Sequence, residues 1–186
     1  MKLSTIIVNW NTRELLKDCL ASVYQQGFSD ENEVWVIDNS STDDSADMVE
    51  RFYPQVKLIK NTQNVGFAKA NNQAILRAQG KYILLLNPDT VLYEGALIHL
   101  VNYLEQHPEV GAVGSKLLNA DGSLQTSCYP EPTLAREFWR MFCLDKIIPF
   151  GTYRTETWDQ NSPRPVEVLM GASLMVRGDL LRSLLR

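Results

Sequence analysis

The sequence has 186 residues, of which 45% are hydrophobic and 22% charged, and its formal net charge at pH 7 is -4. This length suits one α/β domain with a substantial core and leaves little room for a second domain. The acidic balance excludes broad, sequence-independent nucleic-acid binding, although backbone amides or a bound metal ion still permit a local anion site.

Short apolar runs alternate with amphipathic helical patterns, which is typical of βαβ units and a mainly parallel sheet. The predicted strands, in chain order, are residues 4–8, 34–38, 56–60, 82–86 and 110–118. A helix is predicted after each of the first four strands. We therefore expect one Rossmann-like α/β domain over residues 1–186, in which helices flank the central sheet.

The last third of the sequence is less regular. Residues 119–122 are typical of a hairpin turn, and Thr133 is predicted to cap a helix that runs through Leu144. Residues 135–150 mix aromatic with basic side chains, and two interpretations stay open. The segment is either an interfacial helix that approaches a lipid-linked acceptor at a membrane, or a cover for the sheet edge.

The cysteines and the N-terminus bear on location. Cys19, Cys128 and Cys143 are odd in number and widely spaced, which favours neither a disulfide framework nor a Cys-x-x-Cys metal site. Residues 3–8 are too short for a secretory apolar region, and no apolar run reaches transmembrane length. We expect a cytoplasmic protein, with contact at the inner face of the membrane left open.

Three polar segments follow predicted strands directly, namely residues 9–11, 38–40 and 87–89, and residues 64–66 precede a helix. Ligands of open parallel sheets bind outside the carboxyl ends of the strands. Taken singly, each segment has a local explanation as a turn or as an acid at a helix start. Four such segments on one edge are more than a core requires, so the pattern indicates a binding site.

Several familiar motifs are missing from the sequence. No G-x-G-x-x-G turn follows the first predicted strand, and there is no G-x-x-x-x-G-K-[ST] phosphate loop. A G-x-S-x-G nucleophile turn is also lacking. A nucleotidyltransferase of related fold would carry a Gly-rich, basic loop after the first strand, which disfavours that class.

Four segments, in order, carry a family resemblance: residues 4–11, 36–43, 64–72 and 84–89. They resemble the motifs of inverting family-2 glycosyltransferases, with Asn87-Pro88-Asp89 as a variant of the DXD motif. The resemblance implies a GT-A fold and the transfer of a sugar from a nucleotide diphosphate-sugar to a glycan or lipid-linked acceptor. The N-P-D spelling is similar to a branch with many rhamnosyltransferases and cell-surface polysaccharide enzymes. It implies a dTDP- or UDP-sugar, with dTDP-rhamnose favoured.

The resemblance also implies roles for individual residues. Nucleotide-sugar contacts are implied for Val8, Asn9, Asn11, Asp38, Asn64, Gly66, Asn71 and Asn87. Asp38 would accept a hydrogen bond from the nucleobase, and Asn87 would lie near the ribose or the sugar. Asp89 would bind Mg2+ or Mn2+, which bridges the diphosphate. Because Asn87 replaces the first aspartate of the motif, metal affinity without nucleotide is expected to be weak.

The catalytic residue stays unassigned. The family places its general base in an acidic cluster just beyond the segment that residues 166–176 resemble, and Asp179 comes too early to replace it. We expect the base beyond Arg186, and hence a domain truncated at its C-terminus. The alternative is a catalytically impaired nucleotide-sugar-binding fragment or regulatory module. Apolar surface left on residues 166–176 would favour a homodimer.

Overall fold

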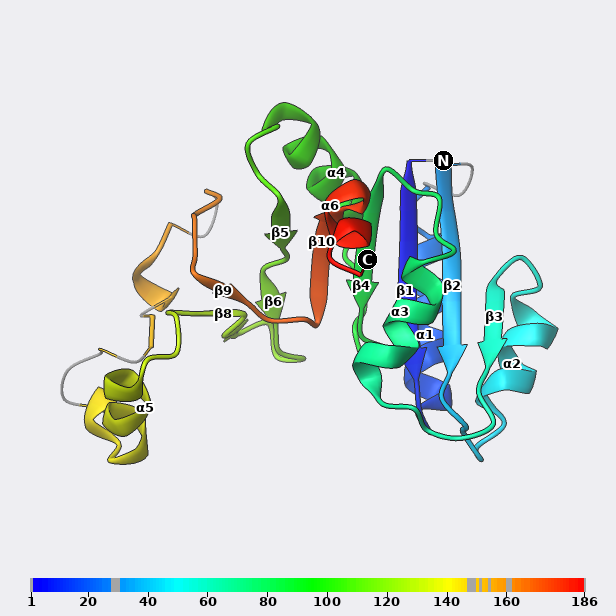
Figure 1. The fold of residues 1–186 in the computed structure, drawn as a ribbon, viewed down its shortest axis with the longest axis horizontal. Coiled ribbons are helices and arrows are strands. Elements are labelled where there is room, and N and C mark those ends of the chain that lie inside the picture. The colour runs from blue at the N-terminus through cyan, green and yellow to red at the C-terminus, as the bar shows by residue number, and fades with distance from the viewer. Residues whose placement is uncertain are drawn as a thin grey trace. The chain divides into compact units, whose positions relative to one another are not determined.

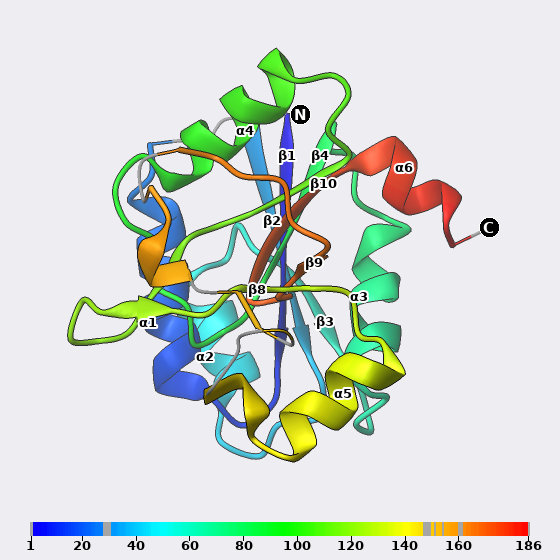
Figure 2. The same ribbon diagram turned by 90° about the vertical axis from the view of Figure 1, so that its left-hand side faces the viewer.

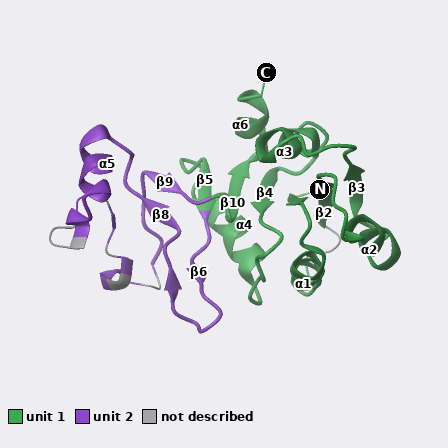
Figure 3. Ribbon diagram, turned by 90° about the horizontal axis from the view of Figure 1, so that it is seen from below, with its two compact units in different colours: residues 1–113, 171–186 green, residues 114–170 purple. Residues whose placement is uncertain are grey.

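The computed structural model of the chain describes residues 2–27, 31–146, 150, 152–153, 155–159 and 162–185. The chain forms two compact units (Figure 3). The first unit comprises Met1–Val113 and Gly171–Arg186, and the second comprises Gly114–Met170. The polar segments singled out in the sequence all belong to the first unit, which therefore holds the predicted site.

A six-stranded sheet forms the centre of the first unit, in the order β3-β2-β1-β4-β10-β5 (Figure 1). Its strands are β1 (Leu3–Asn9), β2 (Asn32–Asp38), β3 (Lys57–Lys60), β4 (Tyr82–Leu86), β5 (Ala112–Gly114) and β10 (Ser173–Arg177). The first four strands pair in parallel, whereas β10 runs antiparallel to β4. The prediction of a mainly parallel central sheet is confirmed.

Helices cover both faces of this sheet (Figure 2). They are α1 (Arg13–Tyr24), α2 (Ser45–Phe52), α3 (Phe67–Ile75), α4 (Ala96–Gln106) and α6 (Gly178–Ser183). Side chains of α1, α2 and α4 pack in one buried cluster with Leu3 and Ile7 of β1. Those of α3 pack in a second cluster with Ile6 and Val8. Alternate residues of β1 thus point to opposite faces, which explains its continuous apolar run.

Among its described residues, the second unit contains short strands, one α-helix and two short 3-10 helices. The predicted turn at residues 119–122 joins β6 (Leu117–Leu118) to β7 (Leu124–Gln125) in a hairpin. Two further strands, β8 (Cys128–Tyr129) and β9 (Val168–Leu169), pair antiparallel. The predicted long strand over residues 110–118 is instead split between β5 and β6, which belong to different sheets.

Helix α5 (Leu134–Met141) begins as predicted, because the Thr133 hydroxyl accepts a hydrogen bond from the Arg136 amide. The helix ends before Leu144, since Cys143 adopts a left-handed φ of 55°. None of the residues of α5 is buried. Ile147 and Ile148, which belong to the same aromatic and basic segment, lie outside the described residues.

The amino edge of the sheet is built around the buried carboxylate of Glu33, whose side chain is 2% exposed. Its oxygens accept hydrogen bonds from Ser4 Oγ at 2.5 Å, the Gln79 amide at 2.5 Å and Lys57 Nζ at 2.6 Å. Burial raises the pKa of Glu33, but the hydrogen bonds from Lys57, Ser4 and Gln79 outweigh it, and the net shift of the pKa is downward. The ionised form is thus the one that the fold stabilises.

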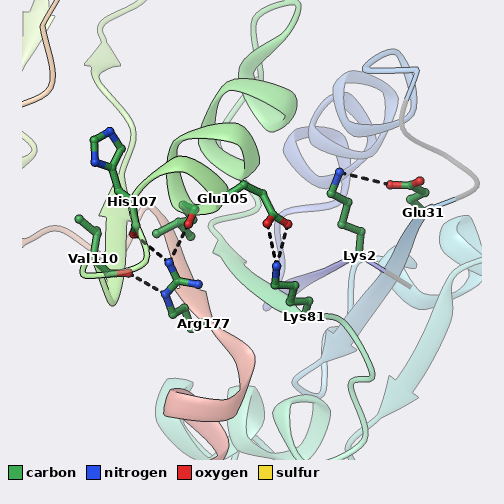
Figure 4. Close-up of polar contacts among 8 residues, drawn as sticks. Lys2, Glu31, Lys81, Glu105, His107, Val110 and Arg177 are labelled. Atoms are coloured by element: carbon green, nitrogen blue, oxygen red, sulfur yellow. Dashed lines mark hydrogen bonds and ion pairs between the residues drawn. The ribbon is translucent and has the colours of Figure 1, made fainter.

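Arg177, at the end of β10, fastens the same edge to helix α4 (Figure 4). Its guanidinium donates to the carbonyl oxygens of Leu104 at 2.7 Å, His107 at 2.9 Å and Val110 at 2.8 Å. A cation at the C-terminus of a helix satisfies carbonyls that have no partner within the helix. This contact accounts for Arg177 without a role in ligand binding.

Candidate functional site

A cavity of about 310 Å3 lies at the carboxyl ends of β1, β2 and β4. It is lined by Val8, Trp10, Thr12, Leu15, Asn39, Asn64, Phe67, Asn87, Pro88 and Asp89. Of the residues that the sequence pointed to, Val8, Asn64, Asn87 and Asp89 line this cavity. The structure places Asn9, Asn11, Asp38, Gly66 and Asn71 outside the lining, the first four in or beside the surrounding loops and Asn71 within helix α3.

Asn9 and Asp38 interlock the turn after β1 with the loop after β2. Asn9 is fully buried, and its Nδ2 donates to Asp38 Oδ1 at 3.0 Å and to Ser41 Oγ at 3.1 Å. The second oxygen of Asp38 accepts from the Ser41 amide at 3.1 Å. Both carboxylate oxygens of Asp38, a residue that is 4% exposed, therefore have partners in the protein. A contact from Asp38 to a nucleobase stays a prediction.

Asn11 and Asp43 add further hydrogen bonds between the turn after β1 and the loop after β2. Asn11 adopts a left-handed φ of 54°, which asparagine tolerates, and its Oδ1 accepts from the Thr42 amide at 2.7 Å. Asp43 accepts from the amides of Arg13 and Ser45, the first residues of α1 and α2, at 2.9 and 3.2 Å. One carboxylate thus serves the N-termini of two helices. This shared role of Asp43 was not foreseen from the sequence.

A chain of side-chain amides fixes the loop that leads into α3. Asn39, which is 2% exposed, donates to Asn64 Oδ1 at 2.7 Å and accepts from Asn61 Nδ2 at 3.1 Å. Gly66 begins the helix with a φ of 84° and donates its amide to Asn64 Oδ1 at 2.9 Å. Asn71 instead donates to the carbonyl of Phe67 within its own helix, at 3.0 Å. Sequence reasoning passed over Asn39, although it stands directly beside Asp38.

The Asn87-Pro88-Asp89 turn forms the opposite wall of the cavity. The Asn87 amide donates to Ala172 O at 2.9 Å, and Thr90 N closes the turn on Asn87 O at 3.2 Å. Beneath the turn, the Cys19 thiol donates to Asn87 O at 3.6 Å. Burial, with a smaller contribution from Asp89, raises the pKa of Cys19 to about 12. Cys19 is therefore a protonated packing residue and not a nucleophile.

The carboxylate of Asp89 is left available for a ligand. Its residue is exposed, and among the described residues none donates a hydrogen bond to it or forms an ion pair with it. Within the same part of the chain, no three His, Cys, Asp or Glu side chains are grouped as a metal site. One carboxylate with a neighbouring asparagine fits Mg2+ or Mn2+ that takes its other ligands from phosphates and water. Asp89 and Asn87 are thus suited to a cation that arrives with a diphosphate.

Apolar side chains at the mouth of the cavity were not foreseen. Trp10, Leu15 and Phe67 line it while remaining 56%, 49% and 53% exposed. Large exposed rings at a concave polar site suit a ligand with a planar or apolar face. The apolar periodicity of α1 and α3 does not distinguish Leu15 and Phe67 from residues of the core, and Trp10 follows the end of β1.

An open α/β sheet with a polar cavity outside its carboxyl ends belongs to the class of folds whose ligands bind at that place. The family model described as "Glycosyl transferase family 2" matches residues 4–154. The chain therefore belongs to glycosyl transferase family 2, as its four motifs indicated, and its fold is GT-A.

Two curated relatives illustrate the family. The chain is 29% identical over 164 residues to an N-acetylglucosaminyl-diphospho-decaprenol L-rhamnosyltransferase of Mycobacterium tuberculosis, covering 77% of this chain and 51% of the relative. It is 33% identical over 112 residues to a poly(ribitol-phosphate) beta-glucosyltransferase of Bacillus spizizenii, covering 58% of this chain and 18% of the relative. The chain thus spans about half, or less, of the length of these relatives.

Two solved structures share the fold. A mannosyltransferase of Pyrobaculum calidifontis in complex with GDP-Man and Mn2+ matches 98% of this chain and 46% of its own, with a TM-score of 0.65 at 24% identity. Staphylococcus aureus TarS 1-349 in complex with UDP matches 98% of this chain and 48% of its own, with a TM-score of 0.66 at 21% identity. Within the described residues, no helix is long and apolar enough to span a membrane.

Proposed function

We propose that this chain binds the donor of a glycosyltransferase that moves a sugar from a nucleotide diphosphate-sugar to a glycan or lipid-linked acceptor. The observation that carries the proposal is the unengaged carboxylate of Asp89 in the cavity, surrounded by polar side chains that have partners. An exposed acid at the carboxyl end of a central strand suits a cation-bridged diphosphate.

Different residues in and around the cavity would bind the cation and hold the cavity walls in place. Asp89 and Asn87 would hold Mg2+ or Mn2+, which supplies positive charge to offset the charge that develops on the leaving diphosphate. The Asn9, Asp38 and Ser41 contacts keep the walls of the cavity fixed before ligand arrives. A site that is rigid in advance loses less free energy on binding.

The finer assignment is a dTDP- or UDP-sugar, with dTDP-rhamnose as the favoured donor and inversion at the sugar. The Asn87-Pro88-Asp89 motif supports this choice of donor, as does the rhamnosyltransferase among the relatives. That relative also supports a lipid-linked acceptor. A cytoplasmic location stays part of this proposal, and the exposed apolar side chains of α5, Leu134, Phe138 and Met141, support peripheral contact with a membrane.

The competing proposal is a nucleotide-sugar-binding module that does not turn over. Its support is that, within the described part of the chain, Asp89 is the one carboxylate that lines the cavity and no second acid there could act as general base. Asp179 follows β10 at the amino edge of the sheet, away from this cavity. Release of sugar from UDP- and dTDP-sugars by the chain itself would count against this alternative.

The proposal is tested by calorimetric titration with UDP and dTDP, with and without Mn2+. We expect binding that is strengthened by Mn2+, and loss of the Mn2+ effect in Asp89→Ala. Glu94→Ala removes a nearby exposed acid that does not line the cavity and should behave as the unchanged chain. A folded chain that binds neither nucleotide, or an Asp89→Ala variant with an intact Mn2+ effect, would contradict the proposal.

A further inference from the structure

Asp89 stands in an irregular segment between β4 and α4. Residues 87–95, all of them described, join these two elements without a helix or strand. Among the backbone groups within the segment, the Thr90 amide donates to Asn87 O at 3.2 Å. A segment with so little internal hydrogen bonding keeps one conformation only where neighbouring elements hold it. The direction of the Asp89 carboxylate therefore depends on contacts from outside the segment.

Ser22, on α1, holds the segment just after Asp89. The Leu92 amide lies 3.0 Å from Ser22 Oγ, and since a backbone N–H only donates, the hydroxyl oxygen accepts there. The same hydroxyl donates to Cys19 O of its own helix at 2.7 Å. Ser22 and Leu92 are buried, whereas the residues on either side of Leu92 are exposed. Leu92 is thus the point at which the segment packs into the core of the first unit.

Cys19 holds the same segment just before Asp89. It lies one helical turn before Ser22, on the same buried face of α1. Its thiol, which is a weak donor, donates to Asn87 O at 3.6 Å, and the residue is fully buried. Helix α1 therefore contacts the segment on both sides of Asp89, through the carbonyl of Asn87 and the amide of Leu92.

The residue that precedes β10 holds the segment from a second direction. Ala172 O accepts from the Asn87 amide at 2.9 Å and from Thr90 Oγ1 at 3.5 Å. Asn87 is thus held through both its amide and its carbonyl, and Leu92 through its amide. The backbone around Asp89 is fixed, while none of the described residues bonds to its carboxylate. A ligand group that is fixed in this way loses less freedom when a cation binds.

We propose that Ser22 and Cys19 are positioning residues for Asp89, acting through the backbone of the segment that carries it. A buried serine that merely satisfied its own hydroxyl would need only the bond to Cys19 O. The second bond, to the Leu92 amide, is the one that joins α1 to the segment. Removal of a group that orients a metal ligand typically weakens metal binding about 10- to 100-fold. The inference rests on the proposed function, because it requires that Asp89 binds the cation.

The test is calorimetric titration with UDP over a series of Mn2+ concentrations, on the unchanged chain and on Ser22→Ala. The substitution removes the acceptor of the Leu92 amide. The Mn2+ concentration that gives half of the gain in UDP affinity (the Mn2+ requirement) should rise about tenfold. The affinity for UDP without Mn2+ should stay unchanged. Amide hydrogen exchange over residues 87–95, measured without ligand, should become faster in Ser22→Ala.

Cys19 offers a matched pair of variants. Cys19→Ala removes the donor to Asn87 O, whereas Cys19→Ser keeps a donor at this position. The Mn2+ requirement should therefore be about threefold higher in Cys19→Ala than in Cys19→Ser. This pair tests the inference independently of whether Ser22→Ala folds.

Val49→Ala separates positioning from stability. Val49 is 1% exposed and packs in the same buried cluster as Cys19, but it belongs to α2, which contacts β3. Its truncation should lower the free energy of unfolding, because it leaves space in the core. The Mn2+ requirement should nevertheless equal that of the unchanged chain.

The possible results separate the inference from the proposed function. An unchanged Mn2+ requirement in folded Ser22→Ala, or an equal rise in Val49→Ala, would overturn the inference and leave the proposed function standing. Equal Mn2+ requirements in Cys19→Ala and Cys19→Ser would overturn the role of Cys19. If the unchanged chain shows no Mn2+ effect, or if Asp89→Ala retains it, both the inference and the proposed function fail.

Discussion

The carboxylates at the two ends of the parallel strands differ in burial and in hydrogen bonding. The amino edge means the amino ends of these strands, and the carboxyl edge means their carboxyl ends. At the amino edge, Glu33 is buried and accepts from Ser4, Lys57 and the Gln79 amide. At the carboxyl edge, Asp89 is exposed, and none of the described residues bonds to its carboxylate. Glu33 lies near the start of β2, and Asp89 follows the end of β4. Of the two carboxylates, only that of Glu33 accepts hydrogen bonds from the described residues.

This difference separates stability from binding. A buried acid that is fully hydrogen-bonded is costly to remove, because its donors are left without partners. An exposed acid without partners adds little to the free energy of unfolding and remains free to bind a cation. The amino edge should therefore respond to substitution in unfolding experiments, and the carboxyl edge in ligand titrations.

The largest expected effect on stability is that of Glu33→Ala. It leaves the Ser4 hydroxyl and the Gln79 amide without an acceptor, and we expect a loss of about 3 kcal/mol in the free energy of unfolding. Denaturant unfolding followed by circular dichroism measures it. Glu31→Ala is the matched control, since its 3.8 Å pair with Lys2 is exposed and should cost less than about 0.5 kcal/mol (Figure 4). Equal losses of unfolding free energy in Glu33→Ala and Glu31→Ala would contradict the stabilising role assigned to Glu33.

A smaller loss is expected for Arg177→Met at the same edge. The substitution keeps much of the apolar stem but removes the donors to the carbonyls of Leu104, His107 and Val110, at a cost of about 2 kcal/mol. Arg177→Lys should recover only part of this loss. An ammonium still donates hydrogen bonds, but it lacks the planar fork that reaches several carbonyls. The same unfolding assay applies, and full stability in Arg177→Met would remove the assigned role.

The loss of stability on acidification should become smaller when Glu33 is replaced. The pKa of Glu33 is lowered in the folded chain from its ordinary value of 4.5, so its contribution is present above that pH. The contribution is lost as the pH falls through the folded pKa, because the unfolded chain then binds the proton more readily. Between about pH 7 and pH 3, the unchanged chain should lose more stability than Glu33→Ala. Parallel pH profiles would contradict this assignment.

The smallest effect concerns thiol reactivity and leaves stability unchanged. Burial raises the pKa of Cys19 to about 12 and also raises the pKa of Cys128, whereas Cys143 is exposed. Alkylation of the folded chain at neutral pH should therefore modify Cys143 and spare the other two cysteines. Peptide mass spectrometry identifies the labelled site. Rapid labelling of Cys19 would mean that the Asn87 turn does not close over it.

Much of the first unit could be predicted from the sequence, because buried parallel strands and amphipathic helices have different periods. The predicted strand at residues 82–86 agrees with β4, and the carboxyl-edge segments do surround one cavity. Which side chain of each segment enters the cavity could not be predicted. Asn39 lines it and Asp38 does not, a distinction that depends on hydrogen bonds to residues about 25 to 30 positions away.

The short strands of the second unit were the hardest to foresee. Residues 110–118 form an apolar run that suits one strand, but the chain divides between two sheets there. The antiparallel pairing of β10 with β4 is likewise a tertiary choice, and it sets Ala172 beside the Asn87 turn. Such pairings depend on distant partners, which local patterns do not identify.

The most direct test of the division between the two edges is to measure unfolding and Mn2+-dependent UDP binding on both Glu33→Ala and Asp89→Ala. We predict that Glu33→Ala loses about 3 kcal/mol of stability but that its folded fraction keeps the Mn2+ effect. Asp89→Ala should unfold within about 0.5 kcal/mol of the unchanged chain and lose the Mn2+ effect. An Asp89→Ala variant that is destabilised as strongly as Glu33→Ala, or that still binds UDP with the full Mn2+ effect, would contradict the account.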